Sequence, residues 1–158
     1  MMRIFRIIGF LCAALILAAA LAYQFRTDPI GPLAGKRLSG EERPFPSDWT
    51  FVKDHPYCFL ETRLSAPHSV TTICFVVNGK LVVPSLNAAE KDWPYYVLED
   101  PTVRIKVGEF VYSARAARIT DFSQDDVRAG ILAKYPEFSD RIPSPLPDTV
   151  WLFELAQR

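Results

Sequence analysis

Polar and aromatic side chains gather where predicted strands end and a predicted helix begins. The N–H groups at a helix start, together with Arg, Lys, His, Ser and Thr side chains, can donate hydrogen bonds to an anion, and Trp offers a flat stacking surface. Taken alone, each residue is more typical of a solvated charge, a turn or a core position. As a group they predict one pocket for an anionic, ring-containing ligand, formed by Arg63, His68, Ser69, Thr71, Lys91 and Trp93.

Familiar catalytic signatures are absent from the sequence. It contains no G-x-S-x-G, H-E-x-x-H, C-x-x-C, Walker or G-x-G-x-x-G motif. Its two histidines, His55 and His68, are too few for a zinc site unless carboxylates or cysteines complete it. We therefore predict no metal site, and the catalytic residues of any reaction stay unknown at this level.

Composition limits the partners of the chain. Its 158 residues are 49% hydrophobic and carry 18 basic and 18 acidic side chains, with no block rich in Lys and Arg. This charge balance does not favour nucleic acid as a partner. The length and apolar content suit one compact domain.

The N-terminus has the pattern of a membrane anchor or an export signal. Arg3 and Arg6 precede an uncharged apolar run over residues 7–23. The run approaches the length that spans a bilayer as a helix, whereas Ala20-Leu21-Ala22 offers a site for signal cleavage. Either reading of residues 1–23 leaves the rest outside the cytoplasm. The protein is then single-pass in the inner (cytoplasmic) membrane, or secreted or periplasmic if the signal is cleaved.

Beyond this segment, residues 24–48 are rich in Pro, Gly and charge without apolar period, which predicts a tether or strap. Residues 49–158 form the predicted domain. Cys58 and Cys74 flank its first hairpin, whose turn we place near Ala66-Pro67. They could pair as a disulfide in an oxidising compartment, or they could be two small buried hydrophobes.

Strand patterns dominate the domain. Runs over residues 57–63, 70–77 and 81–83 are rich in aromatic and β-branched residues, and Asn78-Gly79 is a strong signal for a type I′ hairpin turn. A second hairpin over residues 103–119 turns at Gly108-Glu109. In residues 103–107, Val and Ile alternate with Arg104 and Lys106, which predicts one buried sheet face and one face in water.

Two helices and a last strand complete the predicted order. Asp92 can cap a helix near residues 93–99, and the S-x-x-D capping box at Ser123 precedes a helix near 124–135. A Pro-rich loop leads to a strand over 149–155. This order predicts a mainly β fold with attached helices, namely a small antiparallel barrel.

The stretch SVTTICFVVNGKLVVPSLNAAEKDWPYYVLEDPTVRIKVGEFVYSARAARIT resembles the split β-barrel flavoproteins, the superfamily of pyridoxamine 5′-phosphate oxidase and the deazaflavin-dependent nitroreductases. The resemblance consists of a short-turn hairpin, small residues before a basic residue and Trp-Pro, then Asp100-Pro101 and a V-x-I-x-V strand. It covers about residues 49–120. Ala88-Ala89 stands where deazaflavin reductases tend to carry Gly-Gly.

The resemblance implies a split β-barrel that grips a cofactor phosphate at Lys91 and Trp93, with Arg63, His68, Ser69 and Thr71 nearby. It also implies that barrels pair as a homodimer with the flavin at their interface. The function expected is a membrane-tethered oxidoreductase using FMN or the deazaflavin F420. A non-catalytic envelope module that binds a ligand or a protein without a cofactor is the alternative, and a haem-binding barrel with His55 or His68 as ligand is a third.

Overall fold

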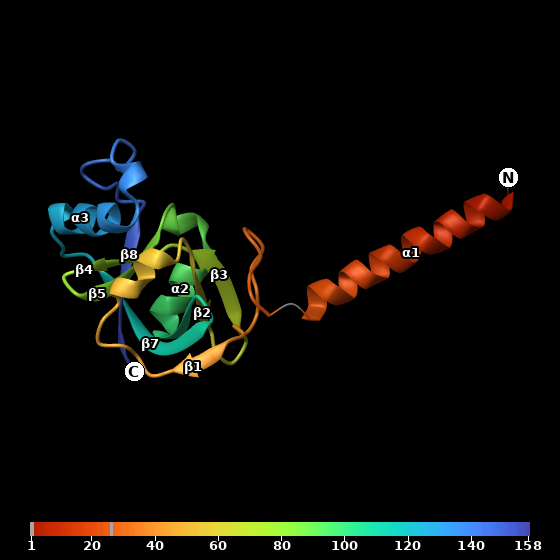
Figure 1. The fold of residues 1–158 in the computed structure, drawn as a ribbon, viewed down its shortest axis with the longest axis horizontal. Coiled ribbons are helices and arrows are strands. Elements are labelled where there is room, and N and C mark those ends of the chain that lie inside the picture. The colour runs from red at the N-terminus through yellow and green to blue at the C-terminus, as the bar shows by residue number, and fades with distance from the viewer. Residues whose placement is uncertain (1, 26) are drawn as a thin grey trace.

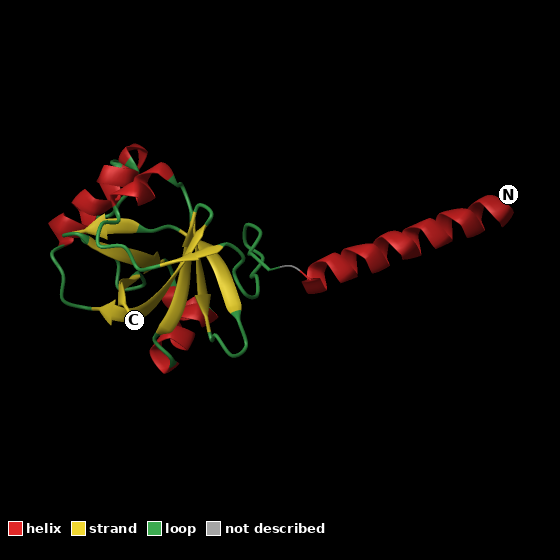
Figure 2. Cartoon of the chain, turned by 60° about the horizontal axis from the view of Figure 1, so that its bottom comes forward, coloured by secondary structure: helices red, strands yellow, loops and turns green. Residues whose placement is uncertain are grey.

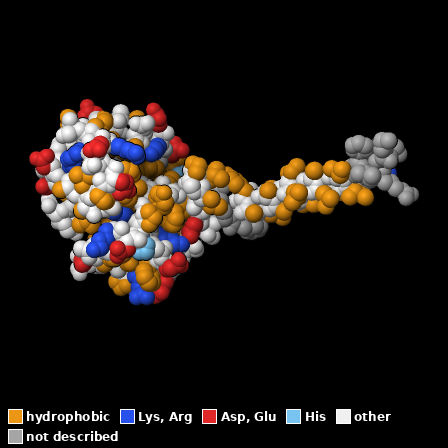
Figure 3. Space-filling view, turned by 45° about the horizontal axis from the view of Figure 1, so that its top comes forward, with side chains coloured by type: hydrophobic (Ala, Val, Ile, Leu, Met, Phe, Trp, Pro, Cys, Tyr) orange, Lys and Arg blue, Asp and Glu red, His pale blue; other side chains and the backbone are white. Residues whose placement is uncertain are grey.

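The computed structural model describes residues 2–25 and 27–158, which form a curled sheet with attached helices and one long N-terminal helix (Figure 1). The helix α1 (Met2–Phe25) extends away from the sheet (Figures 1 and 2). Between residues 6 and 24 its surface is largely hydrophobic (Figure 3), and Leu15 and Ile16 are 69% and 70% exposed. Residues Arg6–Gln24 have a mean hydropathy of 2.2, so α1 could cross a membrane, a test that an N-terminal signal also passes.

Seven strands follow one another in the sheet in the order β3-β2-β6-β7-β8-β5-β4, each antiparallel to its neighbour, and β1 pairs in parallel with the first part of β7. The sheet curls until the Thr72 hydroxyl on one edge donates to the Pro84 carbonyl near the other at 3.4 Å. The predicted split β-barrel is confirmed. Its strands are β1 (Glu41–Arg43), β2 (Cys58–Thr62), β3 (His68–Thr72), β4 (Phe75–Val77), β5 (Lys80–Ser85), β6 (Thr102–Val107), β7 (Phe110–Ile119) and β8 (Trp151–Gln157).

The predicted hairpin turns are present. Asn78 and Gly79 have φ values of 50° and 80°, which a type I′ turn requires, and Gly108 has a φ of 60°. The single strand predicted over 70–77 is wrong, because the chain breaks at residues 73–74 into β3 and β4. The break lets β4 leave β2 and pair with β5 at the other edge of the sheet.

Helices α2 (Asp92–Glu99) and α3 (Gln124–Lys134) confirm the two predicted segments, and short 3-10 turns occur at Thr50–Asp54, Ala88–Glu90 and Pro136–Phe138. The Ser123 hydroxyl accepts a hydrogen bond from the Asp126 N–H at 3.2 Å and caps α3 as predicted. The expected cap of α2 is wrong by one position. Lys91 is the N-cap residue and Asp92 is already helical, and the Lys91 side chain makes no capping hydrogen bond.

Two apolar clusters fill the fold. The larger lies inside the curl of the sheet, where Trp49 packs against Phe45 and Tyr112 with ring centroids 5.0 and 5.1 Å apart. The smaller, which includes Phe75 and Leu152, joins the sheet to α3. These contacts place α3 and the loop after it on the outside of the sheet near β4 and β5 (Figure 1).

Cys58 and Cys74 are free thiols that are fully buried and hydrogen-bonded to each other. The Lys134 ammonium lies 3.7 Å from the Cys74 sulfur. Burial raises the pKa of Cys58, whereas the hydrogen bond from Cys58, together with Lys134, lowers the pKa of Cys74. A disulfide between them in an oxidising compartment stays a prediction.

Residues 27–40, which we call the strap, lie against the sheet and are held by backbone pairing and buried charge. Gly35 exchanges two backbone hydrogen bonds with Ser69 on β3, at 2.8 and 3.2 Å. The carboxylate of Glu61 on β2 accepts from the Leu38 N–H at 2.8 Å. The Asp28 carboxylate pairs with Lys106 on β6 at 2.6 Å. The strap therefore covers one face of β2 and β6.

This cover overturns the prediction that the Arg104 and Lys106 face lies in water. These residues are only 6% and 8% exposed. Arg104 pairs with Glu61 at 2.7 Å and with Glu42 at 2.9 Å. The alternation along β6 is real, but acids from distant parts of the chain neutralise the charged face, which allows it to be buried.

Candidate functional site

A pocket of about 410 Å³ opens where the strap, β3 and the start of α2 meet. We call it the strap pocket. It brings together four of the six predicted site residues, from two separate parts of the chain. It is lined by Gly31, Pro32, Leu33, Ala34, His68, Val70, Thr71, Glu90, Lys91, Asp92 and Trp93.

His68 lies on the wall formed by β3, at the position where the hairpin loop ends. Its ring packs edge-on to Tyr96 of α2 with centroids 5.4 Å apart. Burial, and then the positive charge of Arg63, lower the pKa of His68, and Asp92 opposes them in part. The imidazole is therefore neutral near pH 7 and can donate through one nitrogen and accept through the other.

Arg63 does not line the strap pocket but lies behind His68. Its backbone takes the left-handed conformation, with a φ of 51°, and its guanidinium stacks on Tyr96 at 3.9 Å from the ring centroid. Its Nε atom is buried and has no hydrogen-bond partner among the described residues. The Arg63 guanidinium thus adds positive electrostatic potential to the site without lining the pocket.

Lys91 stands at the mouth of the strap pocket with an acid on each side. It is exposed, as are Glu90 and Asp92. The backbone N–H groups of the first turn of α2 lie at this end, and the Lys91 side chain makes no capping hydrogen bond to them. Lys91 and the helix start attract an anion, while the two carboxylates reduce that attraction.

The two hydroxyl residues of β3 have different surroundings. Thr71 lines the strap pocket, and its Oγ1 has no hydrogen-bond partner in the parts of the chain that the structure describes. Ser69 is fully buried beneath Gly35, where an added Cβ would stand 2.5 Å from the Ser69 hydroxyl oxygen. The strap therefore separates Ser69 from the pocket.

Trp93 belongs mainly to the core. It is 4% exposed, and its ring packs on Phe153 at a centroid distance of 5.1 Å. It contributes only a small part of its surface to the pocket, so it is not an open stacking platform. Tyr96 takes the aromatic position beside the site, which the sequence argument did not consider.

The strap wall was also missed, since residues 31–34 lie more than thirty positions before His68 in the sequence. The site combines the hydrogen-bonding groups of His68, Thr71 and Lys91 with two carboxylates and an apolar strap wall. Among residues 2–25 and 27–158, no three His, Cys, Asp or Glu side chains gather in a way that could hold a metal ion.

Comparison with known proteins identifies the fold. No family model matches the sequence, and no curated protein matches it. A putative pyridoxamine 5′-phosphate oxidase from Listeria innocua has a similar structure, with a TM-score of 0.52 and 15% identity over 68% of this chain and 87% of that chain.

Two further solved structures are similar. An F420-H2 dependent reductase gives a TM-score of 0.50 and 16% identity over 75% of this chain and 99% of its own. HutZ, the heme storage protein from Vibrio cholerae, gives a TM-score of 0.51 and 18% identity over 68% of this chain and 85% of its own. At these identities the likeness concerns the fold alone. The sheet and helices described above thus have the split β-barrel fold of the superfamily that includes pyridoxamine 5′-phosphate oxidases and deazaflavin-dependent reductases.

Proposed function

We propose that this chain is a membrane-tethered split-barrel protein whose strap pocket binds a phosphorylated, ring-containing cofactor, FMN or the deazaflavin F420. The observation that carries the proposal is the set of unsatisfied donors at the strap pocket. Thr71 Oγ1 is buried without a partner in the described residues, and Lys91, the N-cap residue of α2, makes no side-chain capping hydrogen bond. Buried donors without partners are costly, and an acceptor-rich ligand would satisfy them.

Different residues of the strap pocket would contact different parts of the cofactor. Lys91 and the start of α2 would hold the phosphate, and Thr71 and neutral His68 would hydrogen-bond the polar edge of the ligand. Arg63 would add positive potential from behind His68. A bound flavin or deazaflavin supplies hydride transfer, and the chain binds it, orients it and limits access of water.

A non-catalytic binding domain is the second candidate function. Glu90 and Asp92 flank Lys91, and the Trp93 ring is buried, so both the charge and the stacking surface are weaker than a tight cofactor site would have. The same pocket would then bind a small ligand of the extracytoplasmic space without redox chemistry.

The placement of the domain forms part of the proposal. α1 would anchor the chain in the inner membrane, with Arg3 and Arg6 on the cytoplasmic side and the barrel outside. A phosphatase reporter fused after Arg158 should be active outside the cytoplasm. Activity of a cytoplasmic reporter at the same position instead would contradict this orientation.

The binding test uses the full chain in detergent. Its absorption spectrum separates a flavin or deazaflavin band from a Soret band, which would indicate haem with His68 as the candidate ligand. Titration with FMN should give saturable binding, and riboflavin, which lacks the phosphate, should bind more weakly. Size-exclusion chromatography with light scattering tests whether the loaded protein is a homodimer.

Two variants locate the site. Lys91→Ala should weaken FMN or F420 binding by about tenfold or more, because a charge-assisted bond to phosphate contributes about 1.5–3 kcal/mol. Lys53→Ala removes an exposed lysine outside the strap pocket and should leave affinity unchanged. If neither FMN nor F420 binds, or if the Lys91→Ala variant binds them as tightly as the wild type, the cofactor proposal fails.

A further inference from the structure

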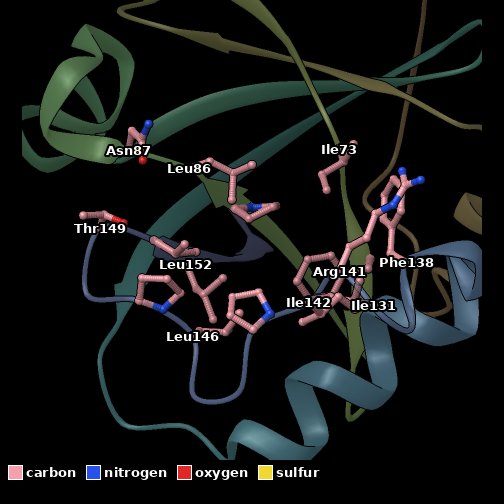
Figure 4. A pocket seen from close by; sticks show the side chains of 15 residues that line it. Ile73, Leu86, Asn87, Ile131, Phe138, Arg141, Ile142, Leu146, Thr149 and Leu152 are labelled. Carbon is pink, nitrogen blue, oxygen red and sulfur yellow. The ribbon is translucent and has the colours of Figure 1, made fainter.

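We propose that a second pocket, unrelated to the strap pocket, binds a single-chain amphiphile with an anionic head, of the medium-chain fatty carboxylate class. This pocket has a volume of about 470 Å³ and lies between α3, the Pro-rich loop before β8, and β5 (Figure 4). We call it the proline-loop pocket. Its volume lies within the range of small-molecule sites, about 300–1,000 Å³. The inference does not depend on the proposed cofactor.

The walls of the proline-loop pocket are almost entirely apolar. Phe75 and Leu152, fully buried residues of β4 and β8, take part in its lining, and Ile131 and Leu146 come from α3 and the loop. Figure 4 shows Ile131 of α3, Leu146 of the loop and Leu152 of β8 around one space. Such a lining binds an alkyl chain through burial of its methylene groups.

Hydrogen bonds from α3 hold the loop that forms one wall. The Arg128 guanidinium donates to the Ser139 and Ile142 carbonyls at 2.7 and 2.9 Å. The Gln124 side chain accepts from the Leu146 N–H at 3.1 Å. A wall held by side chains of a helix is ordered before a ligand arrives, so the entropic cost of binding is small.

One charged side chain belongs to the lining of this apolar pocket. Arg141 is the single charged residue of the lining, and no described residue forms an ion pair with its exposed side chain. Asn87 and Thr149 are the other polar members. One arginine at the edge of an apolar pocket complements a ligand with an anionic head and an apolar tail.

The position of the pocket favours a soluble, single-chain ligand over a bilayer lipid. α3 and the proline loop lie at the end of the barrel away from α1 (Figure 1). The pocket therefore lies at the other end of the barrel from the helix that would enter the bilayer. A carboxylate that reaches it must travel through water, which medium chain lengths allow.

The test measures binding of radiolabelled octanoate, decanoate and dodecanoate to the full chain in zwitterionic nanodiscs by equilibrium dialysis. Empty nanodiscs give the partition into lipid, which is subtracted. Each methylene that the pocket buries should tighten binding about fourfold, so decanoate should bind roughly fifteenfold tighter than octanoate. Decanol, the uncharged analogue, should bind more weakly than decanoate.

Variants assign the binding to this pocket. Arg141→Gln should weaken decanoate binding about tenfold and leave decanol binding unchanged, while Arg141→Lys should keep most of the affinity. Leu86→Glu places a negative charge at a lining position that is 57% exposed, so the fold tolerates it and carboxylate binding should be lost. Arg37→Gln, at an exposed strap arginine, should bind like the wild type.

Three results would overturn the inference. The first is no saturable carboxylate binding above that of empty nanodiscs. The second is binding that neither Arg141→Gln nor Leu86→Glu changes. The third is a dimer that Leu86→Glu dissociates and that decanoate does not affect, since this would show that a second copy of the chain occupies the groove.

Discussion

Truncation of Glu61 should be the most damaging change to a charged residue of the barrel. Its side chain is 1% exposed and its carboxylate receives two hydrogen bonds, from the Arg104 guanidinium at 2.7 Å and the Leu38 N–H at 2.8 Å. Glu61→Ala leaves Arg104, whose side chain is 7% exposed, with Glu42 as its remaining acidic partner and leaves the Leu38 N–H without an acceptor. Removal of one partner from a buried pair costs about 3–5 kcal/mol.

The assay is thermal unfolding of the full chain in detergent, followed by tryptophan fluorescence so that α1 does not dominate the signal. For a domain of this size the predicted loss lowers Tm by roughly 10–20 °C. Glu61→Gln should cost less, because its amide oxygen still accepts from Leu38.

The matched control for this experiment is Glu154→Ala. Glu154 is 26% exposed and pairs with Lys80, which is 61% exposed, so its removal should cost about 0–1 kcal/mol. A loss below about 1 kcal/mol for Glu61→Ala, or a loss equal to that of Glu154→Ala, would refute the view that buried charge holds the strap.

Three further predictions concern the strap and its surroundings. Gly35→Ala should release the strap, because the added Cβ would stand 2.5 Å from Ser69 Oγ, Thr27 O and Pro29 N. Trypsin should then cut the strap faster than in the wild type. The control Gly31→Asn, at a position where the space for a Cβ is open, should not change the rate of cleavage. Acidification below about pH 6.5 should destabilise the fold, because the pKa of His68 is lower in the folded than in the unfolded chain and the unfolded chain therefore binds the proton at a higher pH. Urea titrations should show a lower free energy of unfolding at acidic pH in the wild type and a smaller decrease in His68→Gln. Glutathione disulfide, added while the chain is unfolded and refolded, should oxidise Cys58 and Cys74 to a disulfide and release two molecules of reduced glutathione. Mass spectrometry should then find the protein lighter by two hydrogens. A protein that keeps both hydrogens would contradict this prediction.

Local sequence signals predicted the elements of the fold well. Asn78-Gly79 and the Ser123 capping box depend on backbone geometry within four residues, so a short window contains the information. The break at residues 73–74 was missed because the local composition is strand-like on both sides. What divides the strands is the curl of the sheet, which brings β4 to a partner at the other edge.

The burial of Arg104 and Lys106 could not be read from β6 alone. Their partners, Asp28, Glu42 and Glu61, are 43 to 78 positions away in the sequence. A charged face is normally a wet face, and here the strap together with acids of β1 and β2 reverses that expectation. Gly35 was the local sign of a close backbone approach, but a glycine in a Pro- and Gly-rich segment resembles an ordinary linker.

For the site, the sequence grouped six residues, and the fold places four of them, from β3 and the start of α2, around one pocket. The sequence could not separate Thr71, which faces the pocket, from Ser69, which the strap covers. Nor could it show that Tyr96 rather than Trp93 is the aromatic ring beside His68. Those distinctions depend on tertiary packing.

The path of the strap has a mechanical consequence. Residues 31–34 wall the strap pocket, and the same segment is the only covalent link between α1 and the barrel. When α1 is held in a bilayer, a pull between membrane and domain would first meet the Asp28–Lys106 ion pair and would reach residues 31–34 once that pair breaks. The Asp28–Lys106 ion pair and the Gly35–Ser69 backbone pair bear that load before the sheet does. Tension at the membrane would therefore act on the shape of the pocket before it acted on the stability of the barrel.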